Sequence, residues 1–177
     1  MNRLIFIALS VLFSTTGFAQ IYVLKDHRPD TTPKIQKLYD DLPELCDSFF
    51  SQLKFEEISR ITAFLPEKSY LKATFDTLAI NYNEANLLVK HQNLQLNLQK
   101  QYKKVLKQAA KHKLKLKHLE MKKVNYSYGK DDKGNEFCYV SMICNKRKYE
   151  YEIKFVAIKL LEKWFIVDEL SMQLVIK

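Results

Sequence analysis

Glycine, proline and cysteine are scarce in this chain of 177 residues, which contains three, four and three of them respectively. That scarcity excludes collagen-like, low-complexity and disulfide-dense proteins. The chain also lacks a C-x-x-C pair, a His at metal-ligand spacing, a glycine-rich phosphate loop and a G-x-S-x-G nucleophile motif. Because these motifs carry zinc, nucleotide and hydrolase chemistry, the sequence predicts no metal site and no cofactor, and it favours a non-enzymatic protein.

Long apolar runs are missing as well, except for residues 4–13. Arg3 precedes this run, and Gly17-Phe18-Ala19 follows it with small residues at the positions that a signal peptidase recognises. Residues 1–19 are therefore expected to be a secretory signal peptide cleaved before Gln20, which predicts a periplasmic or secreted protein. A retained membrane anchor and a buried strand are the alternatives. No later stretch reaches the ~20 apolar residues of a spanning helix, so the mature chain is predicted to lack one.

Charge is unevenly distributed, with 29 Lys and Arg against 20 Asp and Glu and a net charge of +9. Residues 100–123 contain ten Lys and a single acid, Glu120, whereas residues 34–76 contain eight acids. An exported protein is not expected to bind nucleic acid, so the lysines have two other interpretations. They form either a solvated face favoured by a helix dipole, or the surface of an electrostatic adaptor for an acidic envelope partner such as a glycan, a lipid headgroup or a protein.

The chain changes character near residue 113. Residues 34–112 contain no Gly and their apolar residues recur at helical spacing, whereas residues 116–177 alternate like strands. Helices followed by strands predict an α+β fold, in which N-terminal helices at 34–112 pack on one face of a C-terminal four-stranded antiparallel meander sheet at 116–177. Residues 20–33 are expected to be an extended segment before this single domain at 34–177.

Two helices can be placed from local signals. Pro43 is expected to interrupt an amphipathic run, and Asp41 to cap the helix that follows. The longest predicted helix covers residues 83–112, although its leucines at 94, 96 and 98 alternate like those of a strand. The expected buried face of this helix contains Leu88, Tyr102, Val105, Leu106 and Ala109.

Residues 136–144 and 149–158 are predicted to form a hairpin whose register follows from hydrophobic pairing. Placing Cys144 opposite Tyr149 makes one face apolar and the other polar. A turn at residues 162–163 would bring Asp168 opposite Ala157 in the same inward row, and a bulge is expected at residues 122–123. The core-facing residues of the hairpin are then Cys138, Val140, Met142, Cys144, Tyr149, Tyr151, Ile153 and Phe155.

The last strand contains Lys163-Trp164-Phe165-Ile166-Val167-Asp168-Glu169-Leu170. It is similar to the Trp-containing closing strand of the nuclear transport factor 2-like and cystatin-like superfamily of cone-shaped α+β domains. Residues 34–177 as a whole resemble this superfamily, and also small exported bacterial proteins of the same shape. The resemblance implies a curved sheet around a cavity. Because the superfamily contains enzymes, transport adaptors and ligand binders, it implies no particular activity.

Four polar side chains are candidates for ligand binding, because they point inward in the predicted sheet: Tyr126, Tyr149, Tyr151 and Asp168. Lining the cavity of a cone, they would orient a small ligand of mixed apolar and polar character. A carboxylate in such a pocket also transfers protons, so a small-molecule enzyme using Asp168 and an inward Tyr is the alternative function. In a third interpretation the hydroxyls reach water and Asp168 lies in solvent.

The three cysteines, Cys46, Cys138 and Cys144, all fall on predicted apolar faces. Cys138 and Cys144 lie ~20 Å apart along one strand and cannot bridge each other. The alternatives are a disulfide from Cys46 to Cys138 or Cys144, and three buried thiols. On the polar face of the sheet, a homodimer surface is suggested by Phe137, Tyr139 and Ile143.

Overall fold

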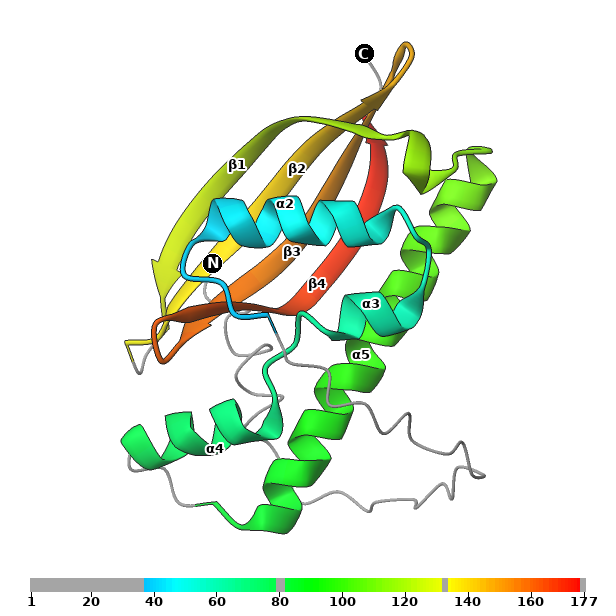
Figure 1. Ribbon diagram of the computed structural model, residues 1–177. Helices are drawn as coiled ribbons and strands as arrows, with labels where there is room; N and C mark the ends of the chain where they lie inside the picture. Colours follow the sequence, from blue (N-terminus) through cyan, green and yellow to red (C-terminus); the bar gives the residue numbers. More distant parts are fainter. Residues whose placement is uncertain (1–36, 79–81, 132–133, 176–177) are drawn as a thin grey trace, which may run out of the picture.

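The protein folds with its helices first and its strands afterwards (Figure 1), so the predicted α+β class is confirmed. The structure, a computed structural model, describes residues 37–78, 82–131 and 134–175; the signal-peptide prediction and residues 20–33 lie outside them. The helices are α2 (Leu42–Leu53), α3 (Ile58–Thr62), α4 (Lys68–Thr77), α5 (Glu84–Lys111) and the 3-10 turn η1 (Leu116–His118). The strands are β1 (Glu120–Lys130), β2 (Glu136–Lys146), β3 (Tyr149–Leu160) and β4 (Lys163–Val175).

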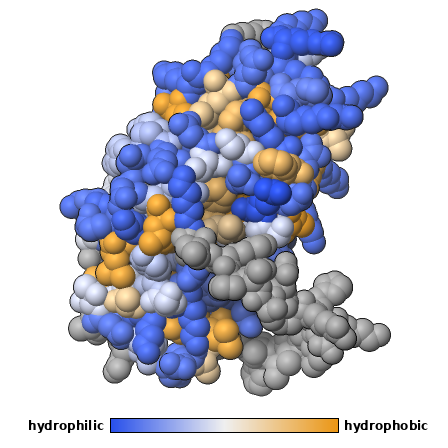
Figure 2. Space-filling model, viewed as in Figure 1, coloured by the Kyte–Doolittle hydropathy of each residue, from blue (hydrophilic) through white to orange (hydrophobic). Residues whose placement is uncertain are grey.

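The four strands form an antiparallel meander in the order β1-β2-β3-β4. Helix α2 lies across one face of this sheet, and α5 runs alongside β4 (Figure 1). Helix α4 also contacts the sheet, because the ring of Tyr70 lies 5.2 Å from that of Phe165 on β4. The surface seen in Figure 2 is hydrophilic over its upper end and has separate hydrophobic patches elsewhere.

Helix α2 begins where its capping residue predicts. The carboxylate of Asp41 accepts a hydrogen bond of 2.7 Å from the Glu44 amide, and Pro43 lies in the first turn, where its missing N–H costs nothing. The buried face of α2 packs on the sheet through Phe49. Its ring lies 5.3 Å from that of Phe64 and 5.0 Å from that of Phe155, both in edge-to-face geometry.

Helix α5 confirms the prediction of a long helix at 83–112. Asn83 caps it by accepting a hydrogen bond of 2.7 Å from the Asn86 amide. Leu94 and Leu98 are buried while Leu96 is 58% exposed, as expected for positions four apart on one helical face. The prediction that Leu88 is buried is wrong, since it is 45% exposed. Among the described residues, no helix is both long and apolar enough to span a bilayer.

The predicted hairpin register is wrong by two residues, although the predicted faces mostly survive. Cys144 pairs with Tyr151 instead of Tyr149, because the turn consists of Arg147 and Lys148 and β2 extends to Lys146. A shift of two residues keeps every side chain on its face. Seven of the eight predicted core-facing residues are accordingly buried. Tyr149 is the exception, since it lies beside the turn and is 49% exposed.

The pairing of β3 with β4 also departs from prediction. The turn consists of Leu161 and Glu162, so Ala157 pairs with Ile166, and register shifts on either side of Val156 bring Asp168 opposite that residue. Asp168 is therefore not opposite Ala157, where the sequence predicted it. The predicted irregularity in β1 is confirmed, because the register of β1 with β2 shifts between residues 121 and 123.

The β3–β4 turn offers a stability test, because both its residues have positive φ: 48° at Leu161 and 63° at Glu162. Side chains with a Cβ lose ~1–2 kcal/mol in this conformation, whereas Asn-Gly adopts it readily. Replacing both residues by Asn-Gly is expected to raise the free energy of unfolding in urea by about 1–2 kcal/mol. The 2.5 Å ion pair of Glu162 with Lys159 is exposed on the Glu162 side, so its loss costs little. An unchanged or lower free energy would contradict this account.

Candidate functional site

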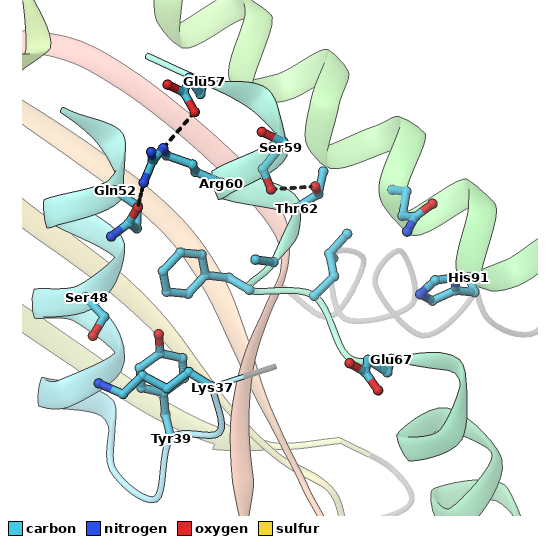
Figure 3. A pocket seen from close by; sticks show the side chains of 14 residues that line it. Lys37, Tyr39, Ser48, Gln52, Glu57, Ser59, Arg60, Thr62, Glu67 and His91 are labelled. Atoms are coloured by element: carbon cyan, nitrogen blue, oxygen red, sulfur yellow. Dashed lines mark hydrogen bonds and ion pairs between the residues drawn. The ribbon is translucent and has the colours of Figure 1, made fainter. Parts of the chain in front are cut away.

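A groove of 860 Å³ opens between α2, α3, the α3–α4 connection and α5 (Figure 3). Ser48 and Gln52 come from α2, Arg60 from α3, and His91 and Gln95 from successive turns of α5. Side chains from four separate parts of the chain therefore face one concave space. Its size falls within the range of small-molecule sites.

The floor of the groove is anchored to β4. The amide of Trp164 donates to the Tyr39 carbonyl at 2.9 Å, and the amide of Ile166 donates to the Phe64 carbonyl at 3.0 Å. The rings of Tyr39 and Phe64 stack with centroids 5.6 Å apart and an interplanar angle of 13°. Two loop segments are thus held against the sheet, and they present an aromatic surface to the groove.

Arg60 is the most constrained charged side chain of the groove. Its Nε donates to Glu57 at 2.7 Å, its Nη1 donates to Gln52 Oε1 at 3.0 Å, and its guanidinium lies 4.0 Å from the centroid of the Phe55 ring. These two hydrogen bonds use two of the five N–H donors of a guanidinium. The remaining donors are held in a fixed geometry, which suits recognition of a carboxylate or phosphate.

The other ionisable groups balance the charge of the groove. Lys37 forms an ion pair of 2.9 Å with Glu44, which raises the Lys37 pKa. On the opposite side, partial burial lowers the pKa of His91 from its ordinary value, and a hydrogen bond to the Pro66 backbone partly opposes this shift. The lowered pKa favours the neutral form of His91, and Arg60 is balanced locally by Glu57.

The four residues predicted to bind ligand do not line this groove. Tyr149 lies at the β2–β3 turn, and Tyr151 is buried with its ring 6.2 Å from that of His112. Tyr126 stacks on Tyr128 with ring centroids 6.2 Å apart. Asp168 pairs with Val156, which lies ~17 Å from Tyr151 along β3. The ligand-binding role of these four residues stays a prediction.

Asp168 is buried at 8% exposure, against α5 instead of in solvent. Its Oδ1 accepts hydrogen bonds from Asn97 Nδ2 at 2.9 Å, from Gln101 Nε2, and from the Glu169 amide at 2.8 Å. Gln101 Oε1 in turn accepts from the Leu170 amide at 2.8 Å. This network fastens α5 to the irregular part of β4, where Glu169 has a φ of 59°. The proton-transfer role of Asp168 stays a prediction.

The three cysteines are buried free thiols in the structure. Burial raises the pKa of Cys46 and of Cys144 to about 12, and it also raises that of Cys138. The thiol of Cys46 interacts with the hydroxyl of Tyr126 and with Cys138. All three are free in the structure, and a bridge from Cys46 to Cys138 or Cys144 stays a prediction.

A thiol count tests the state of the cysteines. Because the thiolate is the reactive form and burial disfavours it, no thiol is expected to react with iodoacetamide in the folded protein near pH 8. In urea without reductant, all three are expected to react and to appear as three added groups by mass spectrometry. A single reactive thiol in urea would show instead that Cys46 is bridged.

Sequence reasoning missed the groove because its residues are ordinary surface types. Gln, Ser, Thr and Glu are common on exposed helices, and their convergence depends on how α2, α3 and α5 pack. One signal was available: Arg60 is the only arginine between residues 29 and 146, in a chain dominated by lysine. A lone Arg within an amphipathic helical region indicates a geometric need for a guanidinium.

Comparison with known proteins adds no assignment. The chain matches no protein-family model, no curated protein and no solved structure.

Proposed function

We propose that the protein is an exported, non-enzymatic binding domain whose ligand occupies the groove between α2, α3 and α5. The observation that carries this proposal is the fixed guanidinium of Arg60 at a groove of 860 Å³. The ligand is a small molecule with a carboxylate or phosphate for Arg60 and an apolar part for the aromatic floor made by Tyr39 and Phe64. Serine, threonine and glutamine side chains supply further hydrogen bonds.

Membership of the nuclear transport factor 2-like and cystatin-like superfamily is part of the same proposal. It is supported by an antiparallel meander with α2 across one face. The proposed site nevertheless differs from the cavity that this resemblance implied. It lies among the helices beside Phe64, whereas the predicted cavity was lined by tyrosines of the sheet.

The experiment is thermal unfolding with a panel of small organic acids and phosphate esters. A ligand at about 100 times its Kd adds ~2.7 kcal/mol to the stability of the folded state. A compound that raises the melting temperature of the protein is then tested on Ser48→Trp, which fills the groove from α2. The matched control is Ser51→Trp, which places the same ring on an exposed position of the same helix.

Stabilisation that is lost in Ser48→Trp and in Arg60→Gln, but kept in Ser51→Trp, would support the groove as the binding site. The proposal fails if no compound of the panel stabilises the protein. It also fails if a stabilising compound acts equally on Ser48→Trp, because that compound would bind elsewhere.

A further inference from the structure

Five lysines form a stripe along one side of α5. Residues three and four apart lie on the same helical face, and these positions follow that spacing over ~16 Å of helix. The opposite side of this part of the helix is buried through Tyr102, Val105 and Ala109. The stripe consists of Lys100, Lys103, Lys104, Lys107 and Lys111, and each of them is exposed.

The positive charge continues around the end of α5. The connection through η1 into β1 adds exposed lysines at 113, 115, 117, 122 and 123, and the β2–β3 turn adds Lys146, Arg147 and Lys148. Contacts hold these segments at one end of the molecule. The ring of His112 lies 6.2 Å from that of Tyr151, and Glu120 pairs with Asn145. These thirteen cations are here called the basic surface; the end of α5 and the start of β1, which carry most of them, lie at the upper right in Figure 1, and the upper end of the molecule is hydrophilic in Figure 2.

The basic surface carries uncompensated charge. None of its side chains forms an ion pair within the described residues, whereas Lys37, Lys68 and Lys72 elsewhere on the molecule do. Among residues 100–123 the single acid is the exposed Glu120. Clustered like charges repel one another and attract an extended anion. The partner that this surface fits is therefore negatively charged over a broad area.

The chemistry of the basic surface favours a membrane over a folded acidic protein. All its cations except Arg147 are lysines, which act as point charges and lack the planar fork that reads individual carboxylates. Two exposed aromatic rings accompany them. Tyr149 is 49% exposed beside Lys148, and Phe55 is 54% exposed next to Glu56, which accepts a hydrogen bond from the Leu116 amide of η1. Lysines combined with exposed aromatics are typical of surfaces that bind anionic headgroups.

We propose that the basic surface binds the anionic phospholipid headgroups of a bilayer, with Tyr149 and Phe55 at the level of the headgroups. Phe55 also contacts Arg60 of the groove, but none of the thirteen cations lines the groove, so the lipid proposal does not depend on a ligand there. Each lysine near an anionic bilayer strengthens binding about fivefold, and salt weakens the attraction. Several lysines acting together therefore give substantial binding without any pocket for a single lipid.

The test is co-sedimentation of the folded protein with vesicles of phosphatidylcholine, and with vesicles in which about a third of it is replaced by phosphatidylglycerol. Binding is expected only to the second kind, and it should fall steeply between about 50 and 500 mM NaCl. Replacing Lys100, Lys103, Lys104 and Lys107 by Gln is expected to reduce the partition coefficient by about 600-fold, which is about fivefold for each lysine. Circular dichroism confirms that each variant is folded.

The matched control removes the same charge elsewhere, through Gln at Lys68, Lys72, Lys130 and Lys154, and is expected to retain most of the binding. The proposal is overturned if the two quadruple variants lose binding equally, since net charge alone would then explain it. It is also overturned if both kinds of vesicle bind equally. Soluble polyglutamate provides a last comparison. If the protein binds polyglutamate as tightly as it binds the anionic vesicles, and if Tyr149→Ser does not weaken this binding, the surface fits an acidic polymer and the lipid proposal is overturned.

Discussion

Replacing Asp168 by Ala is expected to lower the free energy of unfolding by about 2–4 kcal/mol. The carboxylate oxygen accepts hydrogen bonds from Asn97, Gln101 and the Glu169 amide in a largely buried position. Alanine leaves these donors without their acceptor, and a buried unsatisfied donor costs ~1–3 kcal/mol. Urea unfolding followed by circular dichroism measures the effect.

Two further variants separate this structural role from a simple loss of charge. Asp168→Asn retains an acceptor oxygen and is expected to lose about half as much stability as Asp168→Ala. In a double-mutant cycle with Gln101→Ala, the two changes should couple by at least ~1 kcal/mol, because the two side chains share one network. An Asp168→Ala protein as stable as the parent would remove the anchoring role and leave proton transfer as the reason for this carboxylate.

The second large effect is expected at Phe49, which is fully buried where α2 packs on the sheet. Its ring contacts those of Phe64 and Phe155 in edge-to-face geometry. Phe49→Ala removes both contacts and leaves a cavity, and substitutions of this kind cost ~3–5 kcal/mol. The free energy of unfolding in urea is the measurement. The cavity left by Phe49→Ala is also expected to widen the groove, because Phe64, which contacts Phe49, lines it.

Phe55→Ala is the matched control, because it removes the same ring from a position that is 54% exposed. It is expected to change stability by about 1 kcal/mol or less, which includes the loss of the contact with Arg60. Equal losses at Phe49 and Phe55 would contradict the burial that the structure assigns to these two residues.

Those parts of the fold that rest on short-range signals could be predicted from the sequence. Asp41 and Pro43 marked the start of α2 because a capping carboxylate and a proline in the first turn act locally. The faces of β2 and β3 followed from the alternation of apolar and polar residues, although Phe137, Tyr139 and Ile143 interrupt it on the polar face. The exact register could not be predicted, because the turns at Arg147 and Leu161 contain none of the residues that favour positive φ.

The candidate site was less accessible to such reasoning. Its residues come from α2, α3 and α5, whose relative placement is fixed by packing of Phe49 and Phe64 and by the bonds of Tyr39 and Phe64 to β4. For Asp168 the sequence left an inward and a solvent-exposed position open; the structure buries it, and its surroundings were not predicted. The bulge in β4 turns it toward the amides of Asn97 and Gln101, and a bulge leaves little trace in an alternating pattern.

The two outer strands of the sheet differ in how they are covered. Helix α5 runs along β4, whereas β1 pairs only with β2 among the described strands. An uncovered outer strand is a template for pairing with another chain, and lysines and bulges are the usual protection against such growth. Lys122 and Lys123 lie at the irregularity of β1 and are both exposed. The charges that attract a polyanion therefore also oppose the pairing of β1 with a strand of another molecule. Chemical acetylation of these lysines removes the charge and is expected to favour aggregation.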